Sequence, residues 1–159
     1  RVVYNSITMR DNYLTINKGR KDGVEPKMGV VCGTGVVGIV SQVTDHYALV
    51  MSVLNSKSSI SCRLRGNNYF GYLHWQGGNV LTATLDDVPR HANFKVGDAV
   101  ETIGFSNVFP PGLFVGRVLQ IRDSRDGLSS QLTVQLSSDL ANVRDVAVVL
   151  NDHDSDIIP

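Results

Sequence analysis

The residues with the clearest chemical potential are a histidine beside an aspartate, Asp45 and His46, in a segment that is typical of a turn. A chymotrypsin-like serine hydrolase would need such a pair beside a serine on a tight glycine-rich turn. The second half of the chain offers Ser106, Ser124, Ser129, Ser130, Ser137 and Ser138. None of these serines lies in a Gly-x-Ser-Gly setting, so we expect no catalytic residues and keep a degenerate serine hydrolase as the alternative.

Histidines and cysteines do not form a metal-binding pattern. The four histidines are scattered singly, and Cys32 and Cys62 are thirty residues apart with no C-x-x-C pair. We therefore expect no metal. Each cysteine lies among Val, Ile and Ser, which suits a small buried apolar side chain, whereas a Cys32–Cys62 disulfide is possible in an oxidising compartment. Both alternatives stay open.

The run Gly33–Gly38 matches the dinucleotide fingerprint G-x-G-x-x-G letter by letter. That fingerprint requires a helix after the glycines, and here the chain continues as Val36-Val37-Gly38-Ile39-Val40, which is typical of a β-strand. The match indicates a hairpin, and we expect no cofactor.

Two aromatic segments are candidates for partner binding. The first is Tyr69–Trp75, and the second is the Pro-containing loop Phe105–Phe114. Core filling is the other interpretation for most of these side chains, but exposed aromatic anchors are typical of interfaces. The expected partner contacts are Phe105, Val108, Phe109 and Phe114, followed by Tyr69, Tyr72 and Trp75. A glycan- or small-ligand-binding barrel with Trp75 as a stacking platform is a further alternative.

The elements that position these residues are predicted to be strands. The 159 residues include 23 Val, 8 Ile and 8 Thr, and only 2 Glu and 5 Lys. β-Branched side chains favour strands. About ten short alternating runs are separated by turn signals such as Lys21-Asp22-Gly23 and Pro110-Pro111-Gly112. The composition and the turn spacing predict an all-β fold without βαβ units.

An internal repeat predicts two related units. Val24, Met28 and Val30 align with Phe94, Asp98 and Val100 at an offset of 70, and Val37–Val40 aligns with Val115–Val118 at an offset of 78. Each copy carries a glycine within a strand, which marks a bend or a close backbone approach. We expect a linker over residues 1–12, a first β-barrel over 13–76, a second over 77–151 and an acidic tail over 152–159, with exchange of strands between the barrels possible.

Charge is balanced overall but uneven along the chain. Fifteen basic and fifteen acidic residues cancel, so nonspecific nucleic-acid binding is not expected. Residues 1–75 hold 9 Lys/Arg and 4 Asp/Glu, whereas residues 76–159 hold 6 and 11. This asymmetry suggests head-to-tail self-association, with Arg63 and Arg65 of one molecule against Asp86 and Asp87 of the next.

Taken in order, several of these segments resemble the family of the rod shape-determining protein MreC, and the Leu73-x-Trp75 stretch and the Phe105–Pro111 loop look most like its Bacteroidetes branch. The resemblance rests on Leu14–Val24, Met28–Val31, Gly35–Val40, Val96–Gly104 and Phe109–Val118. The chain departs from the family at Lys27, where a glycine is frequent, and at Ile103, where a serine is frequent.

The resemblance implies two six-stranded barrels in a protease-like arrangement without catalytic residues. It implies a periplasmic core of a single-pass inner-membrane protein, attached to the membrane only through an N-terminal helix outside this sequence. It further implies a non-catalytic scaffold of the cell-elongation peptidoglycan machinery that forms homodimers or filaments. The implied partners are the elongation transpeptidase, a class B penicillin-binding protein, together with MreD and MreB.

Overall fold

The computed structural model describes residues 1–66, 69–90, 93–104, 108–125 and 127–150. In these residues the chain forms twelve β-strands and one 3₁₀ turn, η1 (Arg20–Asp22), so the predicted all-β fold is confirmed. No helix within the described ranges has the length and apolar character needed to span a membrane.

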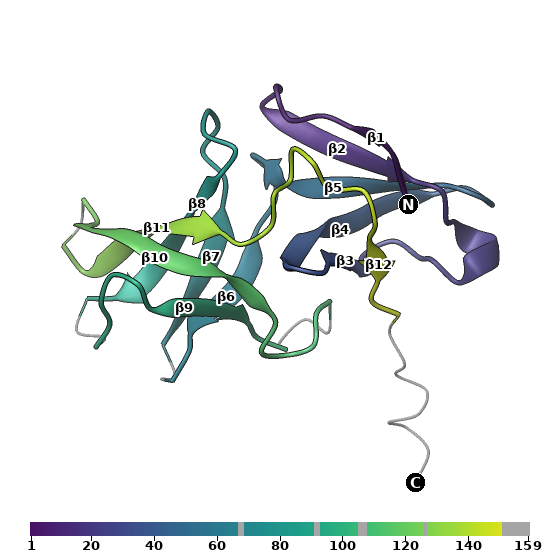
Figure 1. Cartoon of the computed structure of the whole chain (residues 1–159). Coiled ribbons are helices and arrows are strands. Elements are labelled where there is room, and N and C mark those ends of the chain that lie inside the picture. The colour runs from purple at the N-terminus through teal and green to yellow at the C-terminus, as the bar shows by residue number, and fades with distance from the viewer. Residues whose placement is uncertain (67–68, 91–92, 105–107, 126, 151–159) are drawn as a thin grey trace, which may run out of the picture.

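Six strands form a sheet that we call the open sheet (Figure 1). Its order is β1-β2-β5-β4-β3-β12. The strands are β1 (Val2–Asn5), β2 (Asp11–Ile16), β3 (Gly29–Cys32), β4 (Gly35–Val43), β5 (Ala48–Asn55) and β12 (Ala147–Val148). Alternating side chains of these strands are fully buried, among them Leu14, Val37 and Val50.

The other six strands close on themselves, and we call this unit the closed barrel. Its order is β10-β11-β8-β7-β6-β9, and β9 pairs with β10 to complete the ring. The strands are β6 (Ile60–Leu64), β7 (Phe70–His74), β8 (Thr82–Pro89), β9 (Ala99–Thr102), β10 (Phe114–Asp123) and β11 (Ser129–Leu136). The barrel interior contains Leu64, Leu73, Leu85 and Leu132, each fully buried.

The predicted repeat appears as two equivalent hairpins, β3–β4 and β9–β10. Strand-interior glycines allow close approach in both: a Cβ atom at Gly38 would lie 2.2 Å from the carbonyl oxygen of Met51, and one at Gly116 would lie 2.1 Å from that of Gln135. The interpretation of these two glycines as sites of close backbone approach is therefore confirmed.

The predicted division near residue 76 needs correction. β6 and β7 precede that point but belong to the closed barrel, β12 follows it but belongs to the open sheet, and the expected linker contains β1. Each unit therefore takes strands from both sides of residue 76. The alternation of apolar and polar residues along a strand shows which of its faces is buried, but it does not show which strand it pairs with. Pairing depends on which strand edge is available in the folded chain, and here β6 pairs with β9.

The chain between β11 and β12 links the closed barrel to the open sheet, and we call residues 137–146 the strap. It leaves the barrel and crosses to β12 (Figure 1). Val2 N donates to Arg144 O at 2.8 Å, and Asn5 Nδ2 donates to Leu140 O at 2.7 Å. The Leu140 side chain is buried. The strap is therefore hydrogen-bonded to both ends of β1 and connects the open sheet to the barrel.

Candidate functional site

Four side chains form one row across the outside of the closed barrel. Phe114 of β10 is paired with Glu101 of β9, Glu101 with Arg63 of β6, and Arg63 with Phe70 of β7. Side chains paired in this way lie about 5 Å apart on the same face. We call these four residues the Arg–aromatic face, together with their neighbours Arg65, Arg117 and Tyr72.

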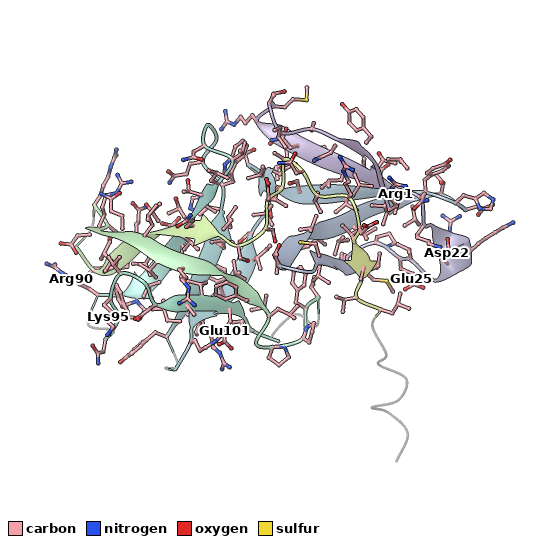
Figure 2. All side chains as sticks on the ribbon, viewed as in Figure 1. Arg1, Asp22, Glu25, Arg90, Lys95 and Glu101 are labelled. Atoms are coloured by element: carbon pink, nitrogen blue, oxygen red, sulfur yellow. The ribbon has the colours of Figure 1, made fainter. Side chains whose placement is uncertain are left out.

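Glu101 organises the centre of this face, and Figure 2 shows it on β9 of the barrel. Its side chain is only 6% exposed. Oε2 accepts from Nε and Nη2 of Arg63 at 3.2 and 3.0 Å, and Oε1 accepts from Nε of Arg65 at 2.7 Å. Burial raises the pKa of Glu101, but the hydrogen bonds and charges of Arg65 and Arg63 outweigh burial and hold the pKa below its ordinary value. The carboxylate therefore stays ionised and orients both guanidinium groups.

Phe114 is held between two arginines at the end of the row. The guanidinium carbons of Arg65 and Arg117 lie 5.6 and 5.4 Å from the centroid of its ring, within cation–π range. Arg117 Nη1 also donates to Gly97 O at 3.0 Å. Arg63, Arg65, Arg117 and Glu101 sum to a formal charge of +2, and Asp86, the cross-strand partner of Tyr72, lies beside the face.

A groove of about 550 Å³ lies between the two units and adjoins this face. Its walls come from the β3–β4 hairpin and the start of β10, and they are mostly apolar. The lining residues are Val31, Cys32, Gly33, Thr34, Gly35, Leu113, Phe114 and Ser137. Phe114 belongs to both the groove and the Arg–aromatic face, so the two features are continuous.

Both cysteines are free thiols in the structure, Cys62 buried and Cys32 partly buried. They belong to different units, since Cys32 is in the open sheet and Cys62 in the closed barrel. Burial raises the pKa of the Cys62 thiol to about 12, so this group is a core side chain. Cys32 Sγ lies 3.5 Å from Ser138 Oγ at the groove.

Two of the expected partner contacts are buried, which corrects their proposed role. Phe109 is 5% exposed and packs on Gly29, where a Cβ would lie 2.5 Å from the ring. Trp75 is 4% exposed, and its Nε1 donates to Asn79 O at 2.9 Å. A large aromatic ring gains more by filling the space between or inside the units than by facing water.

The other expected partner contacts differ in how exposed they are. Tyr72 is 44% exposed, whereas Tyr69, Val108 and Phe114 are partly buried. Phe105 lies outside the described residues. Tyr72 and Phe114 are thus the expected contacts that the structure places on the Arg–aromatic face.

Three of the four residues expected in self-association, Arg63, Arg65 and Asp86, have partners within the chain. Arg63 and Arg65 bind Glu101 as described. Asp86 contacts His74 and accepts from Gln131 Nε2 at 2.8 Å. Asp87 is exposed, with a positive φ of 66°. Head-to-tail association through these groups stays a prediction.

Sequence reasoning missed Glu101 and Arg117. Two sequence features could have drawn attention to Glu101. It is one of only two glutamates in the chain, and it follows the buried Val100 in an apolar segment typical of a strand, where successive side chains point to opposite faces. That pattern indicates an acidic group on the outside of the barrel. Its arginine partners on β6 could be found only once the pairing of β6 with β9 was known.

The described residues offer little for catalysis. His46 is exposed in the turn between β4 and β5. Within the described ranges no group of three or more His, Cys, Asp or Glu is placed to hold a metal ion. What the arrangement offers is binding: an apolar groove beside oriented guanidinium groups and exposed aromatic rings.

The chain is an all-β protein built from two six-stranded units, one an open sheet and one a closed barrel, and the two units have the same strand order. The family model described as "Rod shape-determining protein MreC, barrel core" matches residues 2–150. The chain therefore belongs to the MreC family.

Known relatives agree with this assignment. The cell shape-determining protein MreC of Listeria monocytogenes is 28% identical over 151 residues, covering 93% of this chain and 51% of the relative. The chain spans about half the length of the first curated relatives it matches. A solved MreC structure from L. monocytogenes superposes with a TM-score of 0.87 at 27% identity, covering 94% of this chain and 73% of that one.

Two further solved structures bear on the biology of the family. The major periplasmic domain of a cell shape-determining filament MreC has a TM-score of 0.78 at 26% identity, covering 95% of this chain and 93% of that one. MreC of Helicobacter pylori, solved in complex with penicillin-binding protein PBP2, has a TM-score of 0.69 at 20% identity, covering 88% and 87%. The second likeness shows the fold alone.

Proposed function

We propose that this chain is a non-catalytic scaffold domain of the cell-elongation peptidoglycan machinery, which binds the periplasmic part of the elongation transpeptidase, a class B penicillin-binding protein. The observation that carries the proposal is the Arg–aromatic face, an exposed surface on a closed barrel. The complex of an H. pylori relative with PBP2 supports the choice of partner.

The side-chain types on this face suit protein binding. Phe70 is 40% and Tyr72 44% exposed on β7, next to the arginines of β6. Arginine and aromatic residues are enriched at protein interfaces. Because the barrel closes without a free edge, its outer side chains are held by a rigid frame, and binding costs little additional ordering.

Family membership supports a proposal for the wider setting of the chain. We place the chain in the periplasm, attached to the inner membrane through a single N-terminal helix outside this sequence, with MreD and MreB as partners of the whole protein. Homodimers or filaments form in that setting, and contact of Arg63 and Arg65 with Asp86 and Asp87 of a second copy is one route to them.

The test compares two exposed tyrosines, one on each unit. Tyr72 lies on the Arg–aromatic face, and Tyr47 lies at the end of the open sheet with 51% exposure. Isothermal titration of the cognate transpeptidase's periplasmic part into the chain should show affinity falling about tenfold for Tyr72→Ala and unchanged for Tyr47→Ala. Absence of binding by the unsubstituted chain, or equal losses in the two variants, would contradict the proposal.

A further inference from the structure

The groove and the Arg–aromatic face meet at one residue, Phe114. Leu113 and Phe114 form one wall of the groove, and the ring of Phe114 is also contacted by Arg65 and Arg117. A segment that lies along this path would therefore pass from an apolar slot to a cluster of guanidinium groups within a few residues.

The electrostatics of that path favour carboxylates. Arg63 and Arg65 are 40% and 50% exposed, so part of each guanidinium group faces water while Glu101 fixes its inner side. A fixed guanidinium group loses less freedom when it binds a carboxylate, and the pair forms two parallel hydrogen bonds. The three arginines outnumber Glu101 and the neighbouring Asp86, so the face repels a basic segment and attracts an acidic one.

We propose that the groove and the Arg–aromatic face together bind one extended segment of a partner protein, in which an apolar side chain enters the groove and neighbouring carboxylates bind Arg63 and Arg65. The inference rests on the proposed function, since it gives the chemistry by which the transpeptidase would be recognised at the same site. A volume of about 550 Å³ lies within the usual range for sites that bind small ligands, so it can hold a large side chain and its flanking backbone.

Filling the groove tests the apolar half of the proposal. A Cβ placed at Gly33 meets no atom within 4 Å, so a side chain can start from this groove-lining position without a clash at Cβ. Gly33→Trp should reduce transpeptidase affinity about tenfold, whereas the matched control Gly33→Ala should leave it unchanged. Equal binding by both variants would overturn the role of the groove.

Removing the charges tests the acidic half. The double variant Arg63→Gln with Arg65→Gln retains side-chain donors for Glu101 while removing both positive charges. It should lose about tenfold or more in affinity and should weaken the dependence of binding on salt. The control Arg122→Gln removes one charge from exposed β10, outside the face, and should bind like the unsubstituted chain. A loss of the same size in the control would overturn the proposal in favour of general charge attraction.

The outcomes also separate this inference from the proposed function. If the unsubstituted chain fails to bind the transpeptidase, both are wrong. If it binds, and the Gly33→Trp and double-arginine variants bind equally well, only the inference is wrong.

Two measurements exclude other occupants of the groove. Binding that is insensitive to these variants but rises when residues 151–159 are removed would overturn the proposal in favour of the chain's own acidic tail. Sedimentation velocity in which the double-arginine variant abolishes a dimer without altering transpeptidase affinity would overturn it in favour of a second copy.

Discussion

The open sheet and the closed barrel have the same strand order, but their first and last strands are paired with each other only in the barrel. Starting from β7, the barrel runs β7-β8-β11-β10-β9-β6, which matches β1-β2-β5-β4-β3-β12 position by position. In the barrel the two terminal strands, β6 and β7, are consecutive in the chain and pair as a hairpin. In the open sheet they are β12 and β1, which come from opposite ends of the chain, and β12 has only two residues.

This difference shows that closure depends on connectivity more than on the repeated hairpins. A hairpin brings its strands together at low entropic cost, whereas β1 and β12 must be brought together across the whole chain. The open sheet uses the strap instead, with the Val2–Arg144 hydrogen bond and the buried Leu140. The barrel needs no such segment, because the β6–β7 hairpin closes it.

The largest expected effect comes from loosening the strap. Leu140→Ala removes a buried side chain and should lower the free energy of unfolding by about 3 kcal/mol. Hydrogen exchange should then accelerate in β1 and β12 and stay slow in the barrel. The control Leu119→Ala, at a position 49% exposed, should change stability by less than about 0.5 kcal/mol. Uniform acceleration in both units would show that the strap does not distinguish them.

The next largest effect is expected at the strand-interior glycines that the two units share, Gly38 and Gly116. Gly38→Ala and Gly116→Ala each force a methyl group into the carbonyl oxygen of the adjacent strand. Each should cost about 2 kcal/mol in urea denaturation, with Gly33→Ala as the tolerated control. A large cost at one position and none at the other would contradict the equivalence of the two hairpins.

A smaller gain in stability is expected at Lys27, where the first copy of the repeat lacks the glycine that the second copy has at Gly97. Lys27 and Gly97 are equivalent at an offset of 70, with φ of 74° and 95°, and donate equivalent hydrogen bonds to Val40 O and Val118 O. Only glycine adopts this conformation without strain, so Lys27→Gly should raise the free energy of unfolding by about 1 kcal/mol. Gly97→Lys should lower it by a similar amount. A Lys27→Gly variant less stable than the original chain would contradict this account.

The smallest effect lies on the Arg–aromatic face of the barrel. Since the folded-state pKa of Glu101 is below its unfolded value of about 4.3, its ion pairs stabilise the fold above that pH. This contribution is lost as the pH falls through the folded-state pKa. Glu101→Gln should therefore cost more stability at pH 7 than at pH 3 in urea titrations. The difference should be modest because both arginines are well exposed, and an equal cost at both pH values would argue against the ion pairs.

The sequence predicted the strands and the repeat because both depend on local pattern. The hairpin equivalence followed from Val37–Val40 and Val115–Val118 alone. The sequence could not show to which unit β6 and β12 belong, because the alternation of buried and exposed residues is the same whichever strand edge they pair with.

The candidate site was predicted in part for the same reason. Tyr72 and Phe114 could be identified as aromatic residues in strands, whereas the burial of Phe109 depends on its contact with Gly29, eighty residues earlier in the chain. The ion pairs of Arg63 and Arg65 with Glu101 could not be predicted either, because they depend on the pairing of β6 with β9.

The central claim is that the closed barrel presents the partner surface while the open sheet completes the frame. Hydrogen exchange of the chain with and without the transpeptidase's periplasmic part tests this most directly. We predict new protection confined to β6, β7, β9, the start of β10 and the groove-lining β3–β4 turn, with β1 and β2 unchanged. Protection confined to β1 and β2 would contradict the account.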